Sequence, residues 1–186
     1  LENPLLWDTP THSVRTPLGD ADERELTFAE TFETFISERR LYCSDKQLNS
    51  IYAHYNYFMR FLTEEDGVPP TGRSLSSVTS QVAREFKEHL RQSPSNINKK
   101  YNGLPVRDAV AAAKSDGSPT LAITTQSKFL QHLSSLYAFA IDELEYSGKN
   151  PFQGRADNKL VDQHSRDARD SFSEKQLLTL FSSPLY

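Results

Sequence analysis

The sequence predicts an all-α fold, a bundle of four main helices with a short extra helix and a C-terminal helix. In several segments, apolar side chains recur every three or four residues, the spacing that places them on one face of a helix. Capping residues precede these segments, and Gly or Pro follows them. No strand-length run of alternating apolar and polar residues occurs in the chain. The ordered part is therefore expected to contain helices only.

The first two helices are each expected to begin with a capping box, in which two side chains bond free amides of the first turn. Thr27 and Glu30 have the required spacing in "LTFAETFETFISERR", as do Ser44 and Gln47 in "SDKQLNSIYAHYNYFMRFLTEEDG". Gly67 can close the second helix in a left-handed turn. Each segment carries a broad apolar face, which predicts that this face is buried.

Two shorter helices are expected in the middle of the chain. After the loop "GVPPTGRS", a third helix begins near Thr79. The segment "LPVRDAVAAAKSDG" has Pro105 in its first turn, where a missing amide hydrogen does no harm, and Gly117 after its end.

The longest helix contains "TTQSKFLQHLSSLYAFAIDELEY" and begins near Ser118 or Ala122. It is expected to end at "SGKNPF", where Gly148 provides a left-handed cap and Pro151 prevents continuation. Its apolar residues cover most of the helix circumference, which predicts burial inside the bundle.

Composition divides the chain into four parts. Residues 1–25 are an irregular acidic lead-in, 26–152 the helical domain, 153–170 a polar linker, and 171–186 the start of a new helix. Ser173 is placed to cap that helix, and Phe172 to pack against Leu177 as a hydrophobic staple. A helix that begins so late predicts a second domain beyond Tyr186.

The distribution of charge permits a nucleic-acid partner although the formal net charge is −4. Residues 1–25 hold six acidic and two basic residues, and residues 26–151 hold equal numbers of each. Between Arg84 and Lys114 there are seven bases and three acids, so a local basic patch can form.

No segment indicates a membrane or a secreted, disulfide-bonded protein. No apolar run is long enough for a bilayer span or a signal peptide. Cys43 is the only cysteine and has no partner for an internal disulfide. We therefore expect a cytoplasmic protein.

The sequence offers no constellation for catalysis, metal binding or cofactor binding. The five histidines have no second His or Cys at helical spacing, which favours surface positions on helices. A glycine-rich phosphate loop and a nucleophile elbow are both missing from the sequence. These residues are therefore expected to form neither an enzyme nor a metal or cofactor site.

Two polar helix faces remain as candidate binding surfaces. The face of the long helix consists of Thr124, Lys128, Gln131 and Ser135, flanked by Thr125 and His132. The face of the second helix consists of Lys46, Ser50, Tyr57 and Arg60. Lys99 and Lys100 lie in the predicted loop "SPSNINKKYNG". Hydroxyls, amides and cations of this kind can bind phosphates or base edges, and the alternative is two ordinary solvated faces.

Three segments resemble the phage integrase family of tyrosine recombinases. "TLAITTQSKFLQHLSSLYAFAIDELEYSGKNPF" resembles the last helix of the family's core-binding domain, a SAM-like N-terminal domain. "RDSFSEKQLLTLFSSPLY" is similar to the segment that opens the catalytic domain, and "NKKYNGLPVRDAVAAAKSDG" to an insertion before the final core-binding helix. The resemblance covers roughly residues 26 to 186, and the order and spacing of the motifs carry it.

The resemblance implies a four-helix domain that clamps one face of duplex DNA while a catalytic domain grips the other. The family's second and fourth helices commonly face DNA, which implicates the two polar faces described above. The catalytic residues would lie beyond this chain, and Tyr186 is not placed to be the nucleophile. The resemblance also implies a homo-oligomer on DNA and a contact of Phe139 with the missing catalytic domain or a neighbouring subunit. A helical protein-interaction module that assists recombinase assembly without touching DNA is the alternative.

Overall fold

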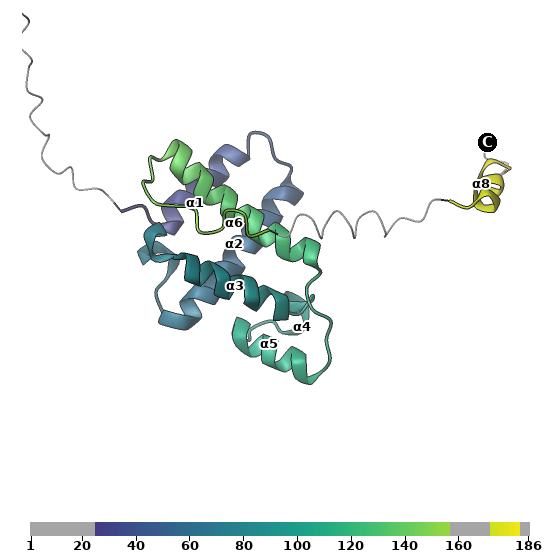
Figure 1. The fold of residues 1–186 in the computed structure, drawn as a ribbon, viewed down its shortest axis with the longest axis horizontal. Coiled ribbons are helices and arrows are strands. Elements are labelled where there is room, and N and C mark those ends of the chain that lie inside the picture. Colours follow the sequence, from purple (N-terminus) through teal and green to yellow (C-terminus); the bar gives the residue numbers. More distant parts are fainter. Residues whose placement is uncertain (1–24, 157–171, 183–186) are drawn as a thin grey trace, which may run out of the picture.

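The computed structural model describes residues 25–156 and 172–182, and the only elements in those ranges are helices and turns (Figure 1). The helices are α1 (Phe28–Arg39), α2 (Asp45–Asp66), α3 (Ser80–Gln92), α4 (Ile97–Lys100), α5 (Val106–Ser115), α6 (Ile123–Glu143) and α8 (Glu174–Phe181). Two 3₁₀ turns, Pro70–Gly72 and Leu75–Ser77, lie between α2 and α3. The all-α prediction is confirmed. Within these ranges, no helix has both the length and the hydropathy of a membrane span.

The capping residues read from the sequence are the ones that start the helices. The Thr27 hydroxyl accepts the Glu30 amide at 3.3 Å, and the Ser44 amide donates to Gln47 Oε1 at 2.9 Å. Gly67 ends α2 with φ of 73°, in the left-handed region that glycine enters without strain. These starts and stops are local, so sequence rules locate them well.

Aromatic side chains from α1, α2, α3 and α6 form the centre of the core. The Phe28 ring centroid lies 6.1 Å from that of Phe58 and 5.9 Å from that of Tyr137. Phe58 also packs on Phe86 of α3, with centroids 4.7 Å apart. The Tyr137 hydroxyl donates to the Leu75 carbonyl at 2.9 Å, so the one polar atom of this buried ring is satisfied.

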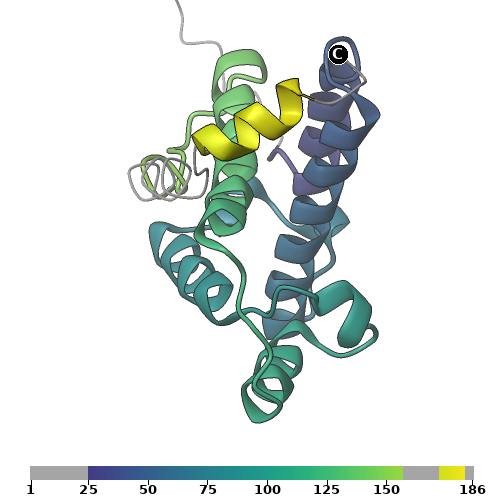
Figure 2. The ribbon, with the colours of Figure 1, turned by 90° about the vertical axis from the view of Figure 1, so that its right-hand side faces the viewer.

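Helix α6 packs against α1, α2 and α3, which explains why apolar residues cover most of its circumference. Figure 2 shows α2 and α3 on opposite sides of α6, and both ribbon views place the α4–α5 segment at one end of the bundle. The Glu64 carboxylate of α2 accepts the Val106 amide at 2.7 Å. This contact attaches α5 to α2 and places a negative charge at the α5 N-terminus, where the helix dipole favours it.

The predicted end of the long helix is wrong. Helix α6 stops at Glu143, and Glu145, not Gly148, adopts the left-handed conformation, with φ of 54°. Gly148 has another role, because a Cβ atom there would lie 2.3 Å from the Tyr146 ring. Asn150 then donates to the Ser134 carbonyl at 2.9 Å, so the chain after the helix folds back along α6.

The outward role expected for Phe139 is also wrong in this structure. Only 9% of Phe139 is exposed, and its ring centroid lies 5.5 Å from that of Phe35 in α1. Because α1 already covers this side chain, it offers no surface to a catalytic domain or a neighbouring subunit.

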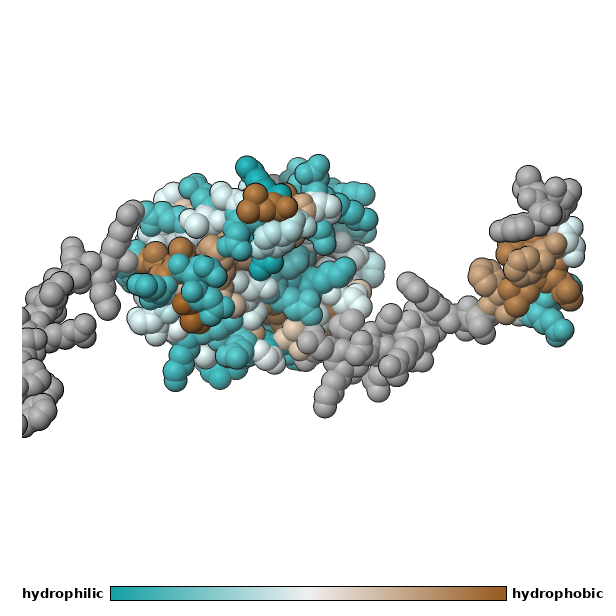
Figure 3. Space-filling view, turned by 90° about the horizontal axis from the view of Figure 1, so that it is seen from above, coloured by the Kyte–Doolittle hydropathy of each residue, from teal (hydrophilic) through white to brown (hydrophobic). Residues whose placement is uncertain are grey.

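Two predicted segments fall mostly outside the described residues, namely the lead-in and the linker. The first linker residues are described and contact α3, since Arg155 donates to the Ser80 carbonyl at 3.1 Å and Lys87 donates to the Arg155 carbonyl at 2.8 Å. In α8, the Ser173 hydroxyl accepts the Gln176 amide at 3.3 Å, which confirms the expected cap. The surface of α8 is largely apolar (Figure 3), with Leu178 62% exposed.

Candidate nucleic-acid interface

Long stretches of α2 and α6 contain bases and no acids. Between Lys46 and Thr63, and again between Gly117 and Ile141, the sequence has no Asp or Glu. The fixed charges of these stretches are therefore Lys46, Arg60 and Lys128, all exposed. Carboxylates lie instead on α1, on α3, at both ends of α2 and at the C-terminal end of α6. We call the surface formed by these parts of α2 and α6 the acid-free face.

The acid-free face has a histidine pair at its centre. His54 Nδ1 of α2 lies 2.8 Å from His132 Nδ1 of α6, and the His54 ring stacks on Phe129 with centroids 3.8 Å apart. A bond between two Nδ1 atoms requires one to carry the hydrogen and the other to accept it, so the accepting ring cannot be doubly protonated.

Burial and nearby cations keep both rings neutral. Burial, then the charges of His132 and Lys128, lower the pKa of His54 to about 3. Burial, then the charges of Lys128 and Arg39, lower the pKa of His132. For the three histidines in the described residues the expected surface position is wrong, because His54 is buried and His89 and His132 are half-buried.

The predicted polar strip of α6 reaches the surface. Lys128 and Gln131 are exposed, and Thr124, Thr125, His132 and Ser135 are half-buried. On α2, Lys46 is exposed and Ser50 is half-buried. Because His132 contacts α2 directly, the structure joins the strip of α6 to the middle of α2.

Tyr57 does not lie on this surface, and its predicted role as an outward contact is wrong. Only 4% of Tyr57 is exposed. Its hydroxyl lies 2.8 Å from His89 Nε2 and 2.8 Å from Ser93 Oγ, both in the C-terminal part of α3 and its cap. The angular position of Tyr57 on α2 suggested solvent, but α3 covers that direction. Tyr57 thus fastens α3 to α2.

The other predicted bases belong to the end of the bundle that holds α4 and α5. The Arg60 guanidinium donates to the Leu104 carbonyl at 2.7 Å, which ties it to the segment between these two helices. Lys100 forms an ion pair with Asp116, with Nζ and Oδ2 2.8 Å apart. Lys99 is exposed on α4. Apart from the buried Tyr57, the site residues predicted from sequence fall into two groups, one on α6 and the first half of α2 and one at the α4–α5 end.

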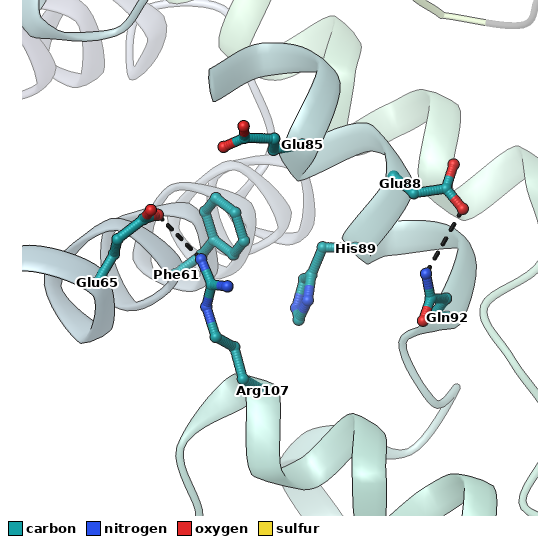
Figure 4. A pocket seen from close by; sticks show the side chains of 7 residues that line it. All are labelled: Phe61, Glu65, Glu85, Glu88, His89, Gln92 and Arg107. Carbon is teal, nitrogen blue, oxygen red and sulfur yellow. Dashed lines mark hydrogen bonds and ion pairs between the residues drawn. The ribbon is translucent and has the colours of Figure 1, made fainter. Parts of the chain in front are cut away.

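A cleft between α2, α3 and α5 has the opposite charge (Figure 4). It encloses about 440 Å³ and is lined by Phe61, Glu65, Glu85, Glu88, His89, Gln92 and Arg107. Arg107 pairs with Glu65 at 2.9 Å and lies over the Phe61 ring, 4.9 Å from its centroid. Three carboxylates against one guanidinium make this cleft unfavourable for a phosphate.

The described residues contain no group of three or more His, Cys, Asp or Glu side chains that could hold a metal ion. Cys43 is half-buried and forms no disulfide.

No family model, no curated protein and no solved structure matches this chain. The resemblance to the phage integrase family therefore depends on the quoted motifs, and the surface chemistry has to support the function independently.

Proposed function

We propose that residues 26–152 are a DNA-binding domain that holds duplex DNA against the acid-free face, as the core-binding domain of a phage-type tyrosine recombinase. The observation that carries the proposal is the pairing of two helices that expose Lys46 and Lys128 and contain no carboxylate along their shared length. A DNA backbone carries one negative charge per roughly 1.7 Å of helix axis, so a surface without fixed negative charge is the side it can approach.

The side chains of the face fit both kinds of contact that DNA offers. Lys128 can neutralise a phosphate, and Gln131 and Thr124 have groups that bond phosphate oxygens or base edges. The N-terminal end of α6 adds the partial positive charge of the helix dipole. In this assignment the domain binds DNA in an integration or recombination complex. Strand breakage belongs to a catalytic domain beyond this chain, and several copies assemble on the DNA.

A salt titration tests the proposal. With about three to five phosphate contacts, log K should fall against log salt with a slope of about −3 to −4.5. Replacing Lys128 by Ala should reduce the magnitude of that slope by about 1. Arg84 of α3 is the matched control, because it is exposed and beside Glu85, so that Arg84→Ala removes the same charge away from the face. Equal slopes for both variants would reject the acid-free face as the interface.

The second candidate function is a helical module for recombinase assembly that does not contact DNA. The exposed apolar residues of α8, among them Leu178 and Leu180, favour it, because exposed apolar side chains that cluster on one helix are typical of protein contacts. This function predicts that duplex DNA does not bind even at low salt, so that charge reversal at Lys128 or Lys46 has no effect on nucleic-acid binding. Binding to DNA with a steep salt dependence contradicts it.

A further inference from the structure

We infer that Arg39, at the end of α1, forms with Lys128 and His132 a site for a single DNA phosphate. The inference rests on the proposed function and deepens it, because it adds a third helix to the interface. Arg39 was not among the residues that the sequence placed at the DNA.

The position of Arg39 is fixed by aromatic rings. Its guanidinium carbon lies 4.9 Å from the centroid of Phe35 and 5.5 Å from that of Tyr42. Phe35 and His132 line the same small cavity between α1, α2 and α6. The stacking therefore holds the cation at the α1 edge of the acid-free face, and the half-buried side chain has little conformational entropy left to lose.

Arg39 and Lys128 bring two positive charges to the same histidine, and no described carboxylate forms an ion pair with either. Both charges act on His132, where they oppose its protonation. The nearest carboxylate along α1, that of Glu38, accepts the Tyr42 hydroxyl at 3.0 Å. Two cations held near one ring without a counter-ion favour an external anion.

The histidine pair prepares His132 to donate to that anion while it is neutral. When His54 Nδ1 carries the hydrogen and His132 Nδ1 accepts it, the second hydrogen position of His132 is Nε2. Nε2 has no hydrogen-bond partner among the described residues, so it can donate to a phosphate oxygen. In this arrangement Arg39 and Lys128 supply the charge, His132 supplies a neutral donor, and His54 is a positioning residue that fixes the tautomer.

The test is a double-mutant cycle on DNA affinity. Arg39→Gln, Lys128→Gln and the double variant are compared with Arg84→Gln by fluorescence anisotropy on a labelled duplex across a salt series. Loss of one phosphate contact lowers the slope by about 0.9, which at 0.1 M salt is about eightfold in affinity. If the two cations share one phosphate, the double variant loses about 0.9 in slope rather than about 1.8. Arg84→Gln should leave the slope unchanged.

Each outcome decides one question. If the unmodified chain does not bind DNA at low salt, the proposed function fails. If it binds and Arg39→Gln leaves both affinity and slope unchanged, only the three-helix site fails. If the salt slope of the double variant falls by about 1.8, the two cations contact different phosphates and the shared site is refuted.

One further variant guards against misfolding, and one spectrum tests the tautomer. Arg39→Lys keeps the charge and should retain the salt slope of DNA binding. It should lower the affinity, because lysine lacks the planar guanidinium that can bind two phosphate oxygens at once. In a nitrogen-detected NMR spectrum, His54 should carry hydrogen on Nδ1 and His132 on Nε2, and the reverse assignment would overturn the donor role of His132.

Discussion

Acidification from pH 7.5 to pH 5.0 should destabilise the domain, because the pKa values of His54, His89 and His132 are all lowered in the folded state. Burial, with the charges of His132 and Lys128, lowers the pKa of His54 to about 3. Burial, with the charge of Arg107, lowers the pKa of His89 to about 4. The unfolded chain titrates near the ordinary value of 6.5 and therefore binds more protons below that pH. Stability is thus full above pH 6.5 and falls as the pH drops toward the folded pKa values.

The size of this destabilisation depends mainly on the pKa of histidine in the unfolded chain. At pH 5.0 an unfolded histidine is mostly protonated while the folded one is not, and the difference of about 1.5 pH units costs about 2 kcal/mol per residue. Two residues give about 4 kcal/mol, a large part of a typical domain stability of about 5–15 kcal/mol. Carboxylates with lowered pKa, such as Asp66, weaken the fold only at lower pH, so this window reports the histidines.

Urea unfolding at the two pH values measures the loss directly. His89→Gln is the matched variant, since Gln cannot titrate, and it should reduce the pH-dependent loss by about 2 kcal/mol. NMR titration of the histidine ring protons should show both rings still neutral at pH 5.0. A difference in unfolding free energy below about 1 kcal/mol between the two pH values would refute the reasoning.

Three substitutions test the packing, each by the urea midpoint of unfolding. Tyr57→Phe should lower the free energy of unfolding by about 1–3 kcal/mol, because it leaves the buried Ser93 hydroxyl with one partner fewer. An unchanged free energy would mean that the Tyr57 hydroxyl does not hold α3 against α2. Phe139→Ala should lower the free energy of unfolding by about 3–5 kcal/mol, as expected for a buried ring. A loss below about 1 kcal/mol would show that Phe139 is exposed. Gly67→Ala should cost about 1–2 kcal/mol because φ is 73°, and an unchanged midpoint would contradict the left-handed cap.

The parts of the fold that sequence predicted are those that local chemistry decides. Thr27, Ser44 and Thr79 cap helices because their hydroxyls or amides engage residues three positions on. Gly67 ends α2 for a similarly local reason. The end of α6 was missed because Glu145 takes the left-handed conformation, while Gly148 serves a contact with Tyr146 that no spacing rule describes.

The candidate site was predicted in part for the same reason. Helical spacing placed Lys128 on an exposed strip, and the structure confirms its exposure. Helical spacing could not predict that Tyr57 is buried, because the helix that covers it, α3, is distant in sequence. It also could not pair His54 with His132, which are 78 residues apart in sequence. The sequence does place Arg39 shortly before the acid-free stretch of α2, but its proximity to α6 is a tertiary feature.

The most direct test of the DNA-binding surface is an NMR titration of the isotope-labelled chain with a short duplex. We expect the amide shifts on α6 from Thr124 to Ser135, on α2 around Lys46 and Ser50, and at Arg39. The cleft lined by Glu85, Glu88 and Arg107 should show none. Shifts confined to that cleft, or no shifts at low salt, would contradict the claim that the acid-free face holds DNA.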